Sequence, residues 1–215
     1  MSEVLNQISE MLQKGKMKDV AALTQQALDE GIDALTILNE GLMPGMDVIG
    51  DKFKRNAIFI PEVLIAARAM AAGTDILRPL LSAGSETQKG TVILGTIKDD
   101  LHDIGKNLVR MMMESKGLNV IDLGTNVQPQ KFVDMAIEHN ADIIACSALL
   151  TTTMVYIKDV VEAVKASPIA GKVKIMIGGA PINQSFCDSV GADYYTPDAP
   201  TAAQTALAIC ENMHA

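Results

Sequence analysis

One loop of the sequence carries the residue types best suited to metal chemistry. Residues 99–107 read Asp-Asp-Leu-His-Asp-Ile-Gly-Lys-Asn, so the imidazole of His102 has carboxylates on both sides. A metal-binding histidine usually has its second ring nitrogen held by a carboxylate, which fixes the tautomer and raises the basicity of the ring. Asp100 can hold His102 in this way from the same loop. A surface histidine that meets an aspartate by chance has the same pattern, so both interpretations stay open on the loop alone.

The other histidines and the cysteines do not complete a conventional metal site around this loop. His139 and His214 are the remaining histidines, and the three cysteines are widely scattered, with no zinc-type spacing. The loop also lacks the glycine patterns of phosphate-binding loops. A single protein histidine can nevertheless hold a metal when a macrocycle supplies the other ligands. The pattern therefore favours a macrocyclic cofactor such as a corrinoid.

Residues 91–215 contain the elements that must position this loop. Short apolar runs suited to buried strands, the first at residues 91–96, alternate with helical stretches in five strand–helix units. This alternation predicts a parallel sheet covered by helices on both faces. Ligands of such sheets bind at the carboxyl ends of the strands, which is where the loop with His102 begins.

The first part of the chain is predicted to be entirely helical. Apolar residues recur at helical spacing over residues 1–82, in four segments with short connections, which predicts an antiparallel bundle. Residues 83–90 are small and polar without periodicity, and this composition indicates a linker. We therefore expect a helical domain over residues 1–82, a linker over 83–90 and an α/β domain over 91–215.

Composition and charge exclude several classes of function. The chain has a formal net charge of −8 at pH 7 and a pI near 4.8, whereas nucleic acids and anionic membranes are bound by clustered Lys and Arg. No apolar run approaches the ~20 residues of a membrane-spanning helix, and no signal peptide is visible at the amino terminus. The odd number of scattered cysteines indicates a reducing compartment. We expect a cytoplasmic protein with neither nucleic-acid nor membrane partners.

Three short motifs give a specific resemblance to a known family. Asp100, His102 and Gly105 form the D-x-H-x-x-G pattern of cobalamin-binding domains, residues 147–149 resemble its S-x-L motif, and residues 178–179 resemble its G-G motif. Each motif falls at the carboxyl end of a predicted strand. The α/β part therefore resembles the cobalamin-binding region of methionine synthase and the corrinoid methyl-carrier proteins of methylotrophic methyltransferase systems.

The helical part resembles the same family. Residues 59–70 look like the helical cap that covers the methyl-bearing face of the corrinoid, with Phe59 facing the cofactor. Ordinary bundle core is the alternative for Phe59. The resemblance covers essentially the whole chain, and it implies an N-terminal four-helix bundle cap followed by a flavodoxin- or Rossmann-like (βα)5 parallel-sheet domain that binds cobalamin.

The resemblance also implies roles for the residues of the site. Cobalamin is expected to bind base-off, with His102 as the lower ligand of the cobalt and Asp100 as the partner of that imidazole. Thr153 is placed where the family has a hydroxyl that completes the relay, although the threonine run 151–153 makes this assignment ambiguous by one position. Asp99 stands where the family often has glycine, and its carboxylate can raise the proton affinity of His102.

The remaining cofactor contacts follow from the same resemblance. Ser147 is expected to meet the displaced base of the cofactor, with Thr151 and Ala199 beside its nucleotide tail. Gly178 and Gly179 are expected to let the backbone pass close to that tail, because a side chain would block it. The full set of expected cofactor contacts is Asp99, Asp100, Leu101, His102, Asp103, Ile104, Gly105, Ser147, Leu149, Thr151, Thr153, Gly178, Gly179, Ala199 and Phe59.

In function, the resemblance implies a methyl carrier that is not an enzyme on its own. A substrate-specific methyltransferase, expected to be a TIM barrel acting on methylated or quaternary amines such as glycine betaine, would methylate the corrinoid. The cofactor would alternate between a Co(I) corrinoid and methylcobalamin. A second methyltransferase would pass the methyl group to tetrahydrofolate or a thiol, and a reductive activator would restore the corrinoid.

Three alternatives differ from this interpretation in recognisable features. The cobalamin-binding subunit of a carbon-skeleton mutase shares D-x-H-x-x-G but normally lacks a helical cap, so residues 1–82 count against it. A cobalamin light sensor that regulates transcription needs a basic DNA-binding segment, which this acidic sequence does not offer. A flavodoxin-like domain without a corrinoid is the third alternative.

Overall fold

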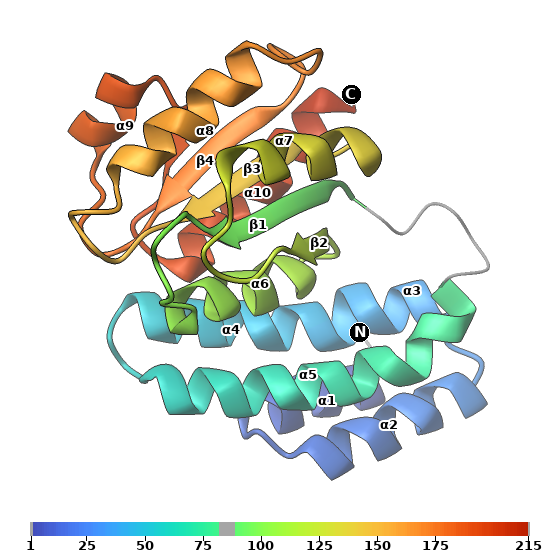
Figure 1. The fold of residues 1–215 in the computed structure, drawn as a ribbon. Helices are drawn as coiled ribbons and strands as arrows, with labels where there is room; N and C mark the ends of the chain where they lie inside the picture. Colours follow the sequence, from blue (N-terminus) through green and yellow to red (C-terminus); the bar gives the residue numbers. More distant parts are fainter. Residues whose placement is uncertain (1, 82–88, 215) are drawn as a thin grey trace. The chain divides into compact units, whose positions relative to one another are not determined.

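The computed structural model describes residues 2–81 and 89–214 (Figure 1). They belong to two compact units, one within residues 1–87 and the other within residues 88–215. Most of the predicted linker, 83–90, lies outside the described residues. Its last two residues, Lys89 and Gly90, belong to the second unit, where the N–H of Lys89 donates to the carbonyl of Gly117 and the N–H of Asn119 donates to the carbonyl of Gly90.

The first unit is helical, as its apolar periodicity predicts. Its core contains fully buried apolar side chains from each part of the unit, among them Ile8, Val20, Leu42 and Leu77. The helices are α1 (Glu3–Gln13), α2 (Met17–Asp29), α3 (Ala34–Thr36), the π-helix η1 (Ile37–Leu42), α4 (Met43–Lys54) and α5 (Ile60–Leu81).

The third predicted helix contains a π-helical turn that periodicity does not reveal. It begins at Asp33, whose carboxylate accepts a hydrogen bond from the N–H of Thr36 at 2.9 Å. The segments α3, η1 and α4 then follow one another without a break from residue 34 to 54. Pro44 lies in the first turn of α4, directly after η1.

The second unit is a five-stranded parallel sheet in the order β2-β1-β3-β4-β5. This is the order of flavodoxin-like folds, and the predicted fold class is confirmed. Helices α6 and α10 pack together on one face of the sheet, and α7 and α8 pack together on the other (Figure 1). The strands are β1 (Thr91–Thr96), β2 (Asn119–Asp122), β3 (Ile143–Ser147), β4 (Lys174–Gly178) and β5 (Tyr194–Tyr195), and the helices are α6 (Ile104–Glu114), α7 (Pro129–Glu138), α8 (Val155–Lys165), α9 (Gln184–Val190) and α10 (Ala199–Met213).

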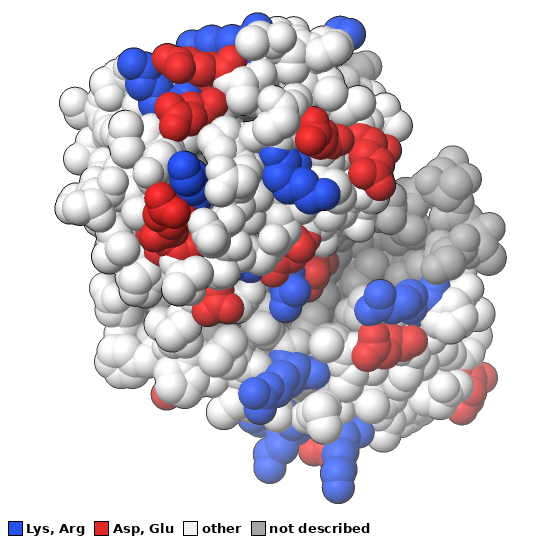
Figure 2. All heavy atoms as spheres, in the orientation of Figure 1, with Lys and Arg blue, Asp and Glu red and all other residues white. Residues whose placement is uncertain are grey.

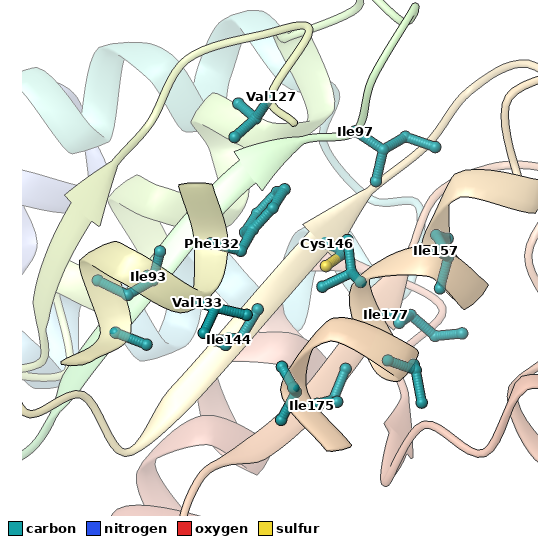
Figure 3. Close-up of a cluster of buried hydrophobic side chains, with 14 of the residues drawn as sticks. Ile93, Ile97, Val127, Phe132, Val133, Ile144, Cys146, Ile157, Ile175 and Ile177 are labelled. Atoms are coloured by element: carbon teal, nitrogen blue, oxygen red, sulfur yellow. The ribbon is translucent and has the colours of Figure 1, made fainter. Parts of the chain in front are cut away.

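The core under α7 and α8 holds the central strands in place. Phe132 of α7 is fully buried against the sheet, and Ile144 and Ile175 extend the same cluster on β3 and β4 (Figure 3). Gly95 of β1 makes room for the ring, because a Cβ at this position would lie 2.9 Å from Phe132. The strands that carry the functional loops are therefore rigidly packed up to their carboxyl ends.

Among the described residues, no helix combines the length and the apolar character needed to cross a membrane. On the face drawn in Figure 2, acidic and basic side chains are interspersed over the described surface. This mixture differs from the continuous basic stripe that binds nucleic acid.

Candidate functional site

The three sequence motifs meet at one edge of the sheet because their strands are in register. Thr96 of β1 pairs with Ser147 of β3, and Ser147 pairs with Gly178 of β4. The loops that follow these strands therefore leave the sheet at the same level. This arrangement brings the loop with His102 beside residues 148–154, at the carboxyl edge where such sheets bind ligands.

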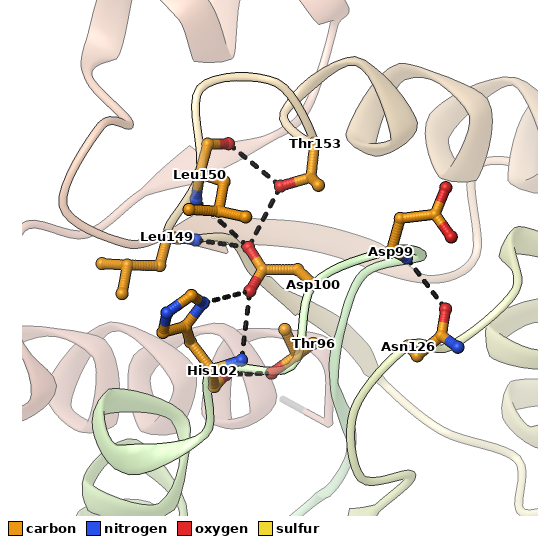
Figure 4. A network of polar contacts seen from close by, with 8 residues as sticks. All are labelled: Thr96, Asp99, Asp100, His102, Asn126, Leu149, Leu150 and Thr153. Carbon is orange, nitrogen blue, oxygen red and sulfur yellow. Dashed lines mark hydrogen bonds and ion pairs between the residues drawn. The ribbon is translucent and has the colours of Figure 1, made fainter.

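His102 and Asp100 form the centre of the site (Figure 4). Nδ1 of His102 lies 2.7 Å from Oδ1 of Asp100, and the backbone N–H of His102 donates to the same oxygen at 3.1 Å. The Asp100 side chain is fully buried, whereas half of the His102 side chain is exposed. A proton on Nδ1, donated to the carboxylate, leaves the lone pair on Nε2, which bonds to none of the described residues. Nε2 is therefore available as a ligand for a metal.

The second oxygen of Asp100 is held by the loop after β3. Oδ2 accepts hydrogen bonds from the N–H of Leu149 at 2.8 Å and of Leu150 at 3.2 Å, and from Oγ1 of Thr153 at 3.0 Å. Burial raises the pKa of Asp100, but the hydrogen bonds from Leu149, from His102 and from Leu150 together outweigh it. The pKa of this carboxyl group therefore lies well below its usual range. Asp100 is an anion at neutral pH although it is buried.

The surface around the imidazole is apolar and open. Leu101 exposes 73% and Ile104 69% of its surface, and Leu149 and Leu150 are also exposed. Gly105 lies in the first turn of α6, where a Cβ would meet no heavy atom of the described chain within 4 Å. Glycine weakens a helix, and neither space nor backbone conformation within the chain requires it here. The site thus offers a nitrogen ligand, apolar surroundings and open space beside the backbone. These features suit a flat metal macrocycle.

The chain matches two family models with the same description. Residues 90–206 match the model of the B12 binding domain, and residues 4–78 match a second model described in the same words. This chain belongs to the B12-binding family. Cobalamin is accordingly the cofactor of this B12-binding protein, and the predicted cap and α/β domain each correspond to one of the two matched regions.

Relatives of this B12-binding protein include corrinoid proteins. It is 41% identical over 201 residues to the dimethylamine corrinoid protein 2 of Methanosarcina acetivorans, and the match covers 93% of each chain. It is 44% identical over 179 residues to the trimethylamine corrinoid protein 2 of the same organism, covering 82% of each chain. A chain in the methanol:cobalamin methyltransferase complex MtaBC from Methanosarcina barkeri matches with a TM-score of 0.86 and 31% identity, over 97% of this chain and 80% of that chain.

The threonine that contacts Asp100 in the B12-binding domain is Thr153. Its side chain is buried, and its hydroxyl lies within hydrogen-bond distance of Asp100 and of the Leu150 carbonyl. Thr151 and Thr152 are exposed on the same loop. The structure thus selects one of the three threonines that the sequence left open, because the turn after Leu150 points only this side chain inward.

Gly178 at the end of β4 and Gly179 directly after it have a structural reason that we did not predict. Gly179 has a φ of +133°, and a Cβ there would lie 1.8 Å from the carbonyl oxygen of Ala148; a Cβ at Gly178 would lie 3.1 Å from the carbonyl oxygen of Thr196. The loop after β3 itself therefore demands glycine at position 179. Proximity of these residues to a nucleotide tail stays a prediction.

Asp99 contacts a different partner from the one we expected. Its carboxylate points away from His102 (Figure 4), and hydrogen bonding to Asp99, together with the charge of Asp99, raises the pKa of the Tyr156 phenol. Asp99 also has a φ of +61°, a left-handed conformation that glycine adopts freely. This backbone would suit the glycine that the resemblance implies at position 99, and no direct contact links the Asp99 carboxylate to the imidazole.

Two further predicted residues lie in very different surroundings. Phe59 exposes 68% of its surface just before α5 in the helical unit, so it is not part of the bundle core. Ala199 is the first residue of α10 and is buried, directly after Asp198, whose carboxylate accepts the N–H of Thr201 at 2.7 Å. Contact of either residue with the cofactor stays a prediction.

Sequence reasoning missed several residues that position the loop. Oγ1 of Thr96 donates to the carbonyl of His102 at 2.8 Å, and the buried ammonium of Lys106 forms an ion pair with Asp122. Oδ1 of Asn126 accepts the N–H of Asp99 at 2.8 Å. None of these residues belongs to the three motifs, and only the order of the strands brings Asp122 and Asn126 beside the loop.

Proposed function

We propose that this protein is a methyl-carrying corrinoid protein. It binds cobalamin base-off, with Nε2 of His102 as the lower ligand of the cobalt. It receives a methyl group from a substrate-specific methyltransferase and delivers the group to a second methyltransferase. The observation that carries the proposal is the half-exposed imidazole, held through Nδ1 by a fully buried carboxylate and surrounded by exposed apolar side chains.

Asp100 controls the chemical state of the ligand. When bound, the corrinoid supplies a metal centre that can accept and donate a methyl group. The anionic Asp100 keeps the proton on Nδ1 of His102, so that the lone pair of Nε2 faces outward. Thr153 and the N–H groups of Leu149 and Leu150 hold Asp100 in place.

The residues around His102 give the macrocycle a surface to lie on. Leu101 and Ile104 expose large apolar areas on either side of the imidazole in sequence, and burial of these areas favours binding by the hydrophobic effect. Gly105 leaves the backbone at the start of α6 open to close approach. Together these residues exclude water from the metal-binding nitrogen once the cofactor is bound.

A methylated amine is the substrate class that we propose for the first partner. The relatives reported above are named dimethylamine and trimethylamine corrinoid proteins and align over most of their length. The partner would be a methyltransferase of the TIM-barrel type. The second methyltransferase would act on tetrahydrofolate or a thiol, and a reductive activator would restore inactive corrinoid. The match of residues 4–78 to a B12-binding model supports this assignment over a mutase subunit, which normally has no such cap.

Ligation by His102 is tested by electron paramagnetic resonance of the Co(II) state. Protein reconstituted with hydroxocobalamin and reduced should show nitrogen superhyperfine splitting that changes when histidine is labelled with 15N. His102→Ala should abolish this response. His139→Ala is the matched control, because His139 is an exposed histidine of the same unit outside the site, and it should behave as wild type. Splitting that is insensitive to the label or unchanged in His102→Ala would refute the lower-ligand assignment.

The carrier role is tested by single-turnover methylation. Reduced protein should be methylated by dimethylamine or trimethylamine only when the methyltransferase specific for that amine is added, as the absorption spectrum of the corrinoid would show. The chain alone should not turn over any amine. Repeated demethylation by the isolated chain, or no methylation with either partner, would contradict the proposed role.

A further inference from the structure

We propose that Asn126 is a positioning residue for His102, acting through the backbone of Asp99 and Asp100. The inference rests on the proposed function, because its consequence concerns His102 as a ligand. Asn126 belongs to the loop between β2 and α7, which none of the three motifs includes. Its side chain does not touch the imidazole.

Asn126 holds the backbone of the loop at two successive residues (Figure 4). Its Oδ1 accepts the N–H of Asp99 at 2.8 Å, and its own backbone N–H donates to the carbonyl of Asp100 at 2.9 Å. Asn126 and Asp99 both have left-handed backbones, with φ values of 55° and 61°. Two left-handed residues other than glycine that bond to each other keep this conformation only when their surroundings fix it.

The neighbouring backbone shows that the whole segment is attached to the loop. The N–H of Thr96 donates to the carbonyl of Gly124 at 2.9 Å, the N–H of Val127 donates to the carbonyl of Thr96 at 3.0 Å, and Ile97 and Val127 form a parallel bridge. The segment 124–127 therefore fixes the main chain of residues 96–100 from one side. The loop after β3 fixes the carboxylate of Asp100 from the other side.

Together, the two attachments leave the Asp100 carboxylate little freedom. Oδ1 must lie 2.7 Å from Nδ1 of His102 to orient the ring, and the position of Oδ1 depends on the backbone at residues 99 and 100. Loss of the Asn126 acceptor frees the N–H of Asp99 and lets this backbone relax from its left-handed conformation. The expected result is a carboxylate that moves and an imidazole that points less consistently at the cofactor.

The matched variants are Asn126→Gly, Asn126→Asp and Asn140→Gly. Glycine at 126 keeps the left-handed conformation accessible and removes only the side-chain acceptor, whereas aspartate keeps an acceptor oxygen at the same place. Asn140 is the control, since it is also left-handed, with a φ of 47°, but lies in the turn after α7. Thermal melting establishes that each variant is folded.

Two measurements report on the imidazole. In protein without cofactor, the resonance of the Nδ1 proton of His102 reports on its bond to Asp100. In reconstituted Co(II) protein, electron paramagnetic resonance gives the ratio of corrinoid with and without histidine on the cobalt. Asn126→Gly should broaden or shift the proton resonance and lower that ratio about two- to tenfold, as expected for the loss of one hydrogen bond. Asn126→Asp and Asn140→Gly should stay within about twofold of wild type, which is below the effect of one such bond.

The outcomes distinguish failure of the proposed His102 ligation from failure of the positioning role of Asn126. If wild type lacks a nitrogen signal that depends on His102, the proposed ligation fails, and the proton resonance of the cofactor-free protein still decides the role of Asn126. If wild type has that signal and Asn126→Gly matches Asn140→Gly in both measurements, the positioning role fails alone. A large loss in Asn126→Asp would likewise refute it, and this test does not depend on whether the glycine variant folds.

Discussion

Nδ1 of His102 and Oδ1 of Asp100 lie 2.7 Å apart, yet the carboxylate is fully buried and the imidazole is half exposed. This pairing joins a charge fixed inside the protein to a ring that faces its ligand. The free-energy cost of removing a charge from water falls on Asp100, because its carboxylate is the buried member of the pair.

The first prediction concerns Asp100→Asn. At neutral pH the substitution should lower the free energy of unfolding by about 3 kcal/mol, since an amide nitrogen replaces one of two acceptor oxygens that face N–H donors. The folded pKa of Asp100 lies below its reference value of 3.8, so the carboxylate stabilises the fold above that pH and loses its effect as the pH falls towards the folded pKa. Urea unfolding should therefore show a difference between wild type and variant that is constant above about pH 5 and shrinks below it. Asp103→Asn, at an exposed carboxylate of the same loop, should show no comparable loss at neutral pH.

Thr153 gives the second prediction. Thr153→Val removes the hydroxyl that bonds to Asp100 and should cost about 1 kcal/mol of unfolding free energy, whereas Thr153→Ser keeps the hydroxyl and should recover most of this loss. Thr152→Val changes an exposed neighbour and serves as the control. Equal effects of valine at positions 152 and 153 in chemical denaturation would show that the buried hydroxyl does not hold the carboxylate.

The third prediction compares alanine substitutions at two glycines of the site. Gly179→Ala should destabilise the cofactor-free protein by about 3 kcal/mol or more, because of its φ and the contact with the Ala148 carbonyl. Gly105→Ala should stabilise it by about 0.5–1 kcal/mol, since alanine favours a helix and meets open space.

The same Gly105→Ala substitution should weaken the binding of cobalamin. Its methyl group would occupy space beside the macrocycle and lower cobalamin affinity about tenfold. Thermal unfolding with and without cobalamin measures both effects. Unchanged affinity in a stabilised Gly105→Ala variant would remove the role assigned to this glycine.

The buried ion pair of Lys106 and Asp122 yields the fourth prediction. Lys106→Met should lower the free energy of unfolding by about 2 kcal/mol, a value below that for a fully isolated charge because Arg110 stays 3.5 Å from Asp122. Lys106→Met combined with Asp122→Asn should cost less than the sum of the two single changes. A double-mutant cycle in urea measures this coupling, and additive losses would mean that the pair contributes nothing as a pair.

The sequence predicts the elements of the fold better than the contacts of the site. The alternation after Thr91 and the helical periodicity before it specify both architectures, because buried faces impose local patterns. The motif at residues 100–105 likewise places His102 and Asp100 next to each other in one loop. These features depend on residues close together in the chain.

Contacts across the sheet could not be predicted in the same way. Thr153 lies 53 positions after Asp100, and Asn126 lies 27 positions after Asp99, so each pairing depends on strand order and register. The left-handed backbone of Asp99 and the close approach of Gly179 to Ala148 are also properties of folded loops. The π-helical turn at residues 37–42 has no counterpart in the apolar spacing.

The use of main-chain donors to hold Asp100 has a consequence for how the site can change. The N–H groups at positions 149 and 150 are present whatever side chains those positions carry, proline excepted. Their leucine side chains are exposed, so packing within the described chain does not require leucine at either position. Mutational libraries at 149 and 150 should thus reshape the apolar surface beside the cofactor while the buried charge is preserved. In this loop the side chains form the apolar surface beside the cofactor, and substitution can change them. The backbone N–H groups hold the charge of Asp100, and substitution leaves them in place.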